Sequence, residues 1–235
     1  EVVLTVDEET GLYGAEAIDM SMLKGKKLIN LDSEEEGIFT VGCAGGIRVQ
    51  TDIPMKREPK SGLCLDFKFQ GILGGHSGIE INNGLANANV LTGRFFMALK
   101  KVCDFEIITL SGGVKENVIP KDAQFSLLIA QPDLAIVEKE LADFNAEIKA
   151  EYAAADPNAV LVMAGAGVSD AYVLDNESMN RLITALNLMP NGVQAMCVDL
   201  PGLVETSLNM GVIALTENNL QMCFSIRSSV STAKA

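Results

Sequence analysis

Hydrophobic and polar residues follow different patterns in the two parts of the chain. At the start, the apolar run 2–6 predicts a short strand, the apolar positions of 15–23 suit a short helix, and 27–31 is the next predicted strand. Acidic residues follow both strands. This order is typical of an α/β domain, in which ligands bind outside the carboxyl ends of parallel strands, so we expect the acidic residues to be neighbours.

From about Cys43 onward the pattern changes to alternation with a period of two. Residues 47–53 and 63–73 alternate like half-exposed antiparallel strands, with a turn region at 54–62 between them. Further strands are predicted at 105–110, 123–130, 160–163, 207–215 and 220–226, the last two as a hairpin, and helices at 84–102, 132–152 and 177–188. We therefore predict an α/β part at 1–43 and, at 44–235, an α+β domain with an antiparallel sheet and helices on one face.

A glycine-spaced stretch after the strand predicted at 160–163 could be a cofactor-binding turn or a plain turn. Ala164-Gly165-Ala166-Gly167 has some likeness to a dinucleotide-binding turn, but Asp170 stands at the third glycine position and no helix clearly begins there. We interpret the stretch as a plain turn.

Composition and charge exclude several functional classes. The chain is 48% hydrophobic and carries a formal charge of −13, from 31 acidic and 18 basic residues, which disfavours nucleic acid and anionic membrane surfaces as partners. Its five cysteines form no C-x-x-C pair, and no apolar run is long enough to span a bilayer. We expect a cytoplasmic protein. Because the chain begins at Glu1, inside a predicted strand, and ends just after another, we expect an internal piece of a longer protein.

Candidate chemistry begins with carboxylates at the ends of the first two strands. Of the adjacent pair Glu8 and Glu9, one can bind a metal while the other takes a proton from water, and Asp32 can supply a further oxygen ligand. An acidic pair at a strand end is also common in a solvated loop. The run 34–36 is interpreted as a solvated turn.

His76 is the only histidine, and it stands in Gly74-Gly75-His76-Ser77-Gly78. It is either an ordinary turn residue or a hydrogen-bond donor to an oxyanion, a role that imidazole can fill near neutral pH. One histidine cannot build a histidine-rich zinc site.

Five motifs together resemble one known family. They are Asp7-Glu8-Glu9-Thr10-Gly11, the segment LINLDSEEEG at 28–37, Gly42-Cys43-Ala44-Gly45-Gly46, Gly74-Gly75-His76-Ser77-Gly78 and Glu205-Thr206-Ser207-Leu208-Asn209. In this order they are similar to the aminoacyl-histidine (Xaa-His) dipeptidases, zinc metallopeptidases related to carboxypeptidase G2 and carnosinase. The resemblance covers nearly the whole chain, and it implies part of a catalytic domain at 1–43 and a lid or dimerisation domain at 44–235.

The resemblance also implies roles for individual residues. Glu8 would be the general base, Glu9 a ligand of one of two zinc ions and Asp32 a ligand of the other, with manganese or cobalt as possible replacements. The family's upstream H-x-D segment, bridging aspartate and late histidine ligand are absent from this sequence. The chain alone is therefore expected not to hydrolyse peptides.

The lid residues would act on the substrate. By resemblance, His76 would polarise the substrate carbonyl or steady the tetrahedral intermediate, in its own or a partner subunit's site. Asn117 and Arg227 would hold substrate polar groups and the carboxylate, which the planar fork of arginine can bind through both oxygens.

These observations lead to one main hypothesis and two alternatives. The main hypothesis is part of a two-zinc dipeptidase that cleaves Xaa-His dipeptides. One alternative is a related amidohydrolase with a different leaving amino acid, since no residue here indicates specificity for a C-terminal histidine in the substrate. The other is a non-catalytic module that forms a homodimer through an exposed sheet edge, independently of metal.

Overall fold

The computed structural model describes residues 1–8, 12–31, 36–40 and 42–234. The chain divides into two compact units, Glu1–Cys43 and Ala44–Ala235. Among the described residues, none of the helices has the length and hydropathy that a membrane span requires.

The first unit contains little regular structure in its described residues. A four-residue helix, α1 (Tyr13–Glu16), is followed by a 3₁₀ turn, η1 (Met20–Met22), where the Asp19 carboxylate accepts a hydrogen bond from the Ser21 amide at 2.9 Å. The strands predicted at 2–6 and 27–31 are not formed. A strand requires a paired neighbour, and side chains such as Leu4, 91% exposed, have none to cover them in this unit's described part.

The second unit is built on an eight-stranded antiparallel sheet. Its strands are β1 (Gly45–Pro54), β2 (Arg57–Gln70), β4 (Glu106–Gly112), β6 (Ala123–Ile129), β7 (Val160–Leu174), β8 (Gly192–Met196), β9 (Val204–Leu215) and β10 (Asn219–Ser228). They pair in the order β1-β10-β9-β4-β6-β2-β7, and β8 also pairs with β9. A separate two-stranded sheet joins β3 (Gly75–His76) to β5 (Val118–Ile119).

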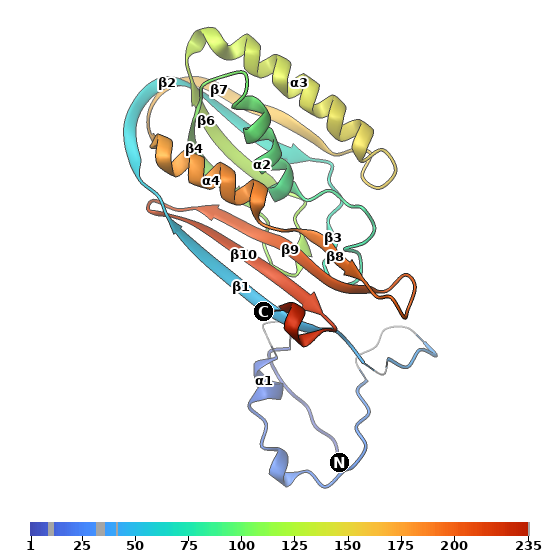
Figure 1. The fold of residues 1–235 in the computed structure, drawn as a ribbon. Helices are drawn as coiled ribbons and strands as arrows, with labels where there is room; N and C mark the ends of the chain where they lie inside the picture. The colour runs from blue at the N-terminus through green and yellow to red at the C-terminus, as the bar shows by residue number, and fades with distance from the viewer. Residues whose placement is uncertain (9–11, 32–35, 41, 235) are drawn as a thin grey trace. The chain divides into compact units, whose positions relative to one another are not determined.

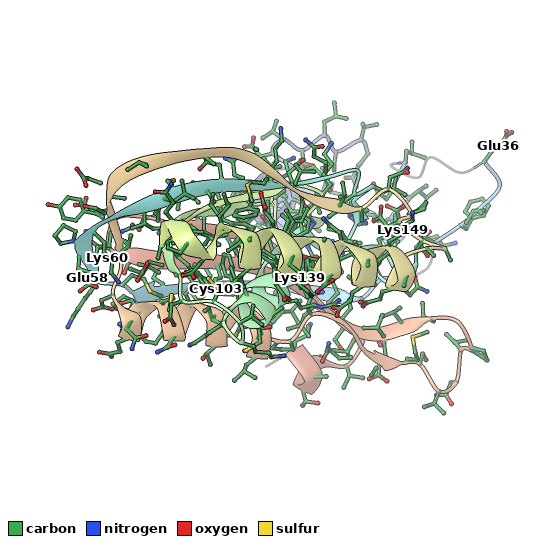
Figure 2. All side chains as sticks on the ribbon, turned by 90° about the horizontal axis from the view of Figure 1, so that it is seen from above. Glu36, Glu58, Lys60, Cys103, Lys139 and Lys149 are labelled. Atoms are coloured by element: carbon green, nitrogen blue, oxygen red, sulfur yellow. The ribbon has the colours of Figure 1, made fainter. Side chains whose placement is uncertain are left out.

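Three helices cover one face of the large sheet (Figure 1): α2 (Ala88–Leu99), α3 (Leu134–Glu151) and α4 (Asn176–Leu188). Two 3₁₀ turns, η2 (Gln131–Asp133) and η3 (Ser231–Lys234), complete the unit. In the view from above in Figure 2, α3 carries Lys139 and Lys149 and runs lengthwise beside β7. The predicted antiparallel sheet with helices on one face is confirmed.

The core between helices and sheet is aromatic. Phe125 of β6 stacks on Phe67 of β2 at 5.2 Å between ring centroids and meets Phe96 of α2 edge-on at 4.8 Å. Phe95 of α2 links this group to Phe144 of α3 at 5.2 Å. All five rings are almost fully buried. Burial of large rings from two strands and two helices holds the layers together.

Two strands are longer than the alternation pattern predicts. β2 begins at Arg57, inside the predicted turn region, and includes Pro59. Among the strands that the structure describes, residues 57–62 pair with β7 alone, so one side of this part is an edge, where a residue without an N–H is tolerated. β7 likewise continues through 164–167, so the interpretation of that stretch as a turn is wrong. Gly165 lies beside an irregularity in the β2 pairing, which glycine accommodates.

Candidate functional site

His76 lies at the end of β3, in the small two-stranded sheet. His76 pairs with Val118 across β3 and β5, and the Ser77 amide donates to the Asn117 carbonyl at 2.9 Å. Gly74 has a φ of +68°, and a Cβ there would lie 2.9 Å from the Ile119 carbonyl oxygen. Glycine is therefore required for the loop to approach β5 this closely.

The charge state of His76 is set by its surroundings. Partial burial lowers its pKa, the nearby Arg227 guanidinium lowers it further, and the Glu80 carboxylate opposes these effects. Glu80 also accepts a hydrogen bond from the His76 backbone amide at 2.7 Å. The Gly78 amide donates to Nδ1 of His76 at 3.3 Å. An imidazole whose Nδ1 accepts a hydrogen bond carries its proton on Nε2 when neutral.

Arg227 reaches the same place from β10. Its backbone pairs with Gly46 of β1 and Ser207 of β9. A Cβ on Gly78 would lie 3.0 Å from both Cζ of Arg227 and Cε1 of His76, so the two side chains flank this glycine. Nε of Arg227 is buried and has no hydrogen-bond partner among the described residues. A guanidinium with an unused donor beside a neutral imidazole suits a carboxylate-bearing ligand.

Asn117 lies in the same part of the structure as His76. It immediately precedes β5 and is half-buried, and its carbonyl is the acceptor for the Ser77 amide. The structure therefore brings the three predicted lid residues together: His76 and Asn117 through the β3–β5 pairing, and His76 and Arg227 through Gly78.

The predicted metal and base residues lie elsewhere in the chain. Glu8 belongs to the first unit, where it is exposed and its carbonyl accepts a hydrogen bond from the Leu12 amide at 3.1 Å. Glu9 and Asp32 lie outside the described residues. Within the described ranges, no group of three or more histidine, cysteine, aspartate or glutamate side chains is placed to hold a metal ion.

Sequence reasoning missed the buried asparagine behind this site. Asn209 is 1% exposed and donates from Nδ2 to the carbonyls of Glu116 and Val118, both at 2.8 Å. It ends the Glu205-Thr206-Ser207-Leu208-Asn209 motif. The available signal was an asparagine among the apolar positions of a predicted strand, where an amide is disfavoured unless its hydrogen bonds are satisfied.

Comparison with known proteins gives consistent results. A protein-family model described as "Peptidase dimerisation domain" matches residues 68–156. Cytosol non-specific dipeptidase of Escherichia coli (strain K12) is 36% identical over 236 residues, covering 100% of this chain and 48% of that protein. The crystal structure of aminoacylhistidine dipeptidase from Vibrio alginolyticus superposes with a TM-score of 0.83 at 34% identity, over 98% of this chain and 47% of that one. The chain thus spans about half the length of the relatives that it matches.

Proposed function

Because this chain belongs to the M20 family of peptidases, in the group of the aminoacylhistidine dipeptidases, we propose that it is part of a dipeptidase that hydrolyses Xaa-His dipeptides. The observation that carries the proposal is the position of His76 and Arg227 on either side of Gly78. This arrangement offers a hydrogen-bond donor and a carboxylate-binding group a few ångströms apart, as hydrolysis of a dipeptide requires.

Different side chains bind the substrate and polarise its scissile carbonyl. Arg227 binds the C-terminal carboxylate of the dipeptide, since its unpartnered Nε–H belongs to a fork that matches two carboxylate oxygens. His76, kept neutral by its lowered pKa, donates from Nε2–H to the carbonyl oxygen of the scissile bond. The side-chain amide of Asn117 holds a further polar group of the substrate.

The base and metal ligands of the proposal come from the first unit. Glu8 is the general base that takes a proton from the attacking water. Glu9 and Asp32 are proposed zinc ligands, with manganese or cobalt as alternatives, and the remaining ligands of the two ions come from other parts of a longer protein. Bound there, the metal supplies Lewis acidity for water and carbonyl. Two carboxylates leave the coordination incomplete, so the 235 residues alone are proposed to be inactive. A cytosolic location is proposed because the E. coli relative is named a cytosol dipeptidase.

Histidine release from Gly-His tests this function in the longer protein that contains the chain. With zinc present, Glu8→Ala is expected to lower kcat by about 100-fold or more, as loss of a general base does. Glu16→Ala, which removes another exposed glutamate of the same unit, is the matched control and should retain activity. Activity on other dipeptides but not on Gly-His would favour a related amidohydrolase, and inactivity on all of them would refute the peptidase proposal.

A homodimer is a second proposal, and the description of the matched family model favours it. β1 and β7 are the ends of the main strand path, so each leaves one side available for pairing, and on β7 the side chains of Val168 and Tyr172 are 80% and 67% exposed. Light scattering after size exclusion, with and without chelator, tests it. A chelator-insensitive dimer supports pairing through this unit, and a monomer refutes it.

A further inference from the structure

The segment 116–118 crosses over β9 at a point where, among the described residues, the strand has no strand partner on one side. β8 pairs with β9 up to Leu208, and β4 pairs with it from Ile213. Between these positions lies Gly211, where a Cβ would be only 2.4 Å from Cα of Glu116. The glycine therefore allows the segment to lie directly against the strand.

Asparagine side chains fill the gap in the ladder, and those of Asn87, Asn89 and Asn209 are buried. The Met210 amide donates to Oδ1 of Asn191 at 2.8 Å, and the Met210 carbonyl accepts from Nδ2 of Asn89 at 3.1 Å. Oδ1 of Asn209 accepts from Nδ2 of Asn87 at 3.3 Å. Because that oxygen is engaged by Asn87, the amide orientation of Asn209 is determined, and its two N–H donors point to the segment 116–118.

We propose that Asn209 is a positioning residue that holds His76 and Asn117 in their working geometry. Its two hydrogen bonds, both 2.8 Å, reach the carbonyls on either side of Asn117. The second of these belongs to Val118, whose backbone pairs with His76. One buried side chain thus fixes both substrate-facing residues, and no apolar or acidic residue of similar size could donate the same pair of bonds.

The catalytic meaning of this role rests on the proposed function, but the geometry does not. His76 is the only histidine of the chain, so its imidazole gives one Cε1–H resonance in a proton NMR spectrum. The midpoint of its titration reports how closely His76 is held in its partly buried place, with Arg227 lowering the pKa and Glu80 opposing that effect. This readout needs no peptidase activity and can be made on the 235-residue chain.

Two alanine variants form a matched pair. Asn209→Ala removes the two bonds to the carbonyls flanking Asn117. Asn145→Ala also removes two hydrogen bonds between an asparagine side chain and the backbone, one donated by Nδ2 to the Leu161 carbonyl at 2.8 Å and one accepted by Oδ1 from the Leu161 amide at 2.9 Å, where α3 meets β7. We expect the midpoint of the His76 titration to rise toward its ordinary value in Asn209→Ala and to stay at the wild-type value in Asn145→Ala.

The outcomes separate the inference from the proposed function. An unchanged titration in Asn209→Ala, or an equal change in Asn145→Ala, overturns the positioning role. If Asn209→Ala does not fold, Asn209→Ser, which keeps one donor, must move the midpoint in the same direction. In the longer protein, Asn209→Ala is expected to lower kcat for Gly-His by about 100-fold, as misplacement of a reacting group by about 1 Å does. Absence of peptidase activity in the wild type refutes only the proposed function.

Discussion

A buried carboxylate holds both ends of the loop that carries His76. Asp156 is 1% exposed, and its two oxygens accept hydrogen bonds from the Leu73 amide at 3.0 Å and the Ala86 amide at 3.1 Å. No salt bridge to Asp156 occurs in the described part of the chain. The carboxylate is therefore stabilised in the interior mainly by these backbone donors.

Replacing Asp156 by asparagine keeps the shape and changes one acceptor into a donor. The amide oxygen retains one hydrogen bond, but the NH₂ group then faces a backbone N–H that has lost its acceptor. A hydrogen bond to a charged group contributes about 1.5–3 kcal/mol, and removal of the buried charge offsets part of its loss. We expect Asp156→Asn to lower the free energy of unfolding by about 2 kcal/mol. That loss corresponds to a decrease in Tm of about 4–8 °C for a chain of this length.

Urea unfolding followed by far-UV circular dichroism measures this change, since most regular structure lies in the second unit. Asp175→Asn is the matched control. Asp175 caps α4 by accepting from the Ser178 amide at 2.8 Å, and asparagine caps a helix about as well, so a change within about 0.5 kcal/mol is expected. Equal stability of Asp156→Asn and wild type would refute the reasoning, as would an equal loss in both variants.

Three further changes test the packing and the electrostatics. Gly93→Ala should destabilise the fold by about 1–2 kcal/mol in urea, because a Cβ would lie 2.7 Å from Cβ of Leu186, whereas Gly167→Ala, with nothing within 4 Å, should not. Phe125→Leu should lower the free energy of unfolding by about 1–3 kcal/mol, since it removes three ring contacts from the core, and an unchanged urea midpoint would contradict this. Because the pKa of His76 is lowered in the folded state from its ordinary value of 6.5, the unfolded state binds a proton more readily as pH falls. Wild type should therefore lose stability relative to His76→Gln as pH falls through and below 6.5. Parallel pH profiles of the free energy of unfolding for the two proteins would contradict this prediction.

The general architecture follows from local patterns in the sequence. Period-two alternation at 47–53 is sufficient to predict β1, and the apolar stripe at 177–188 predicts α4 closely. The start of α2 differs from the prediction by four residues, because the cap is Asn87, whose side chain accepts from the amides of residues 89 and 90. Local patterns are informative where burial on one face selects the residues.

The site is only partly accessible to such reasoning. The motif around His76 and the resemblance of the flanking segments are sufficient to name His76, Asn117 and Arg227 as candidates. Nothing local in the sequence indicates that Asn209 donates to the segment beside Asn117, because hydrogen bonds between distant strands and loops leave no periodic signal.

The sequence by itself determined the antiparallel α+β class and the chemical types available at the site, since alternation and residue identity are properties of the chain. Only the tertiary structure decided that β2 begins before Pro59, and that strands predicted at 2–6 and 27–31 are not formed. The tertiary structure also brings His76 and Arg227 to either side of Gly78. The physical reason is the same in each case: strand pairing and side-chain convergence depend on partners far away in the sequence.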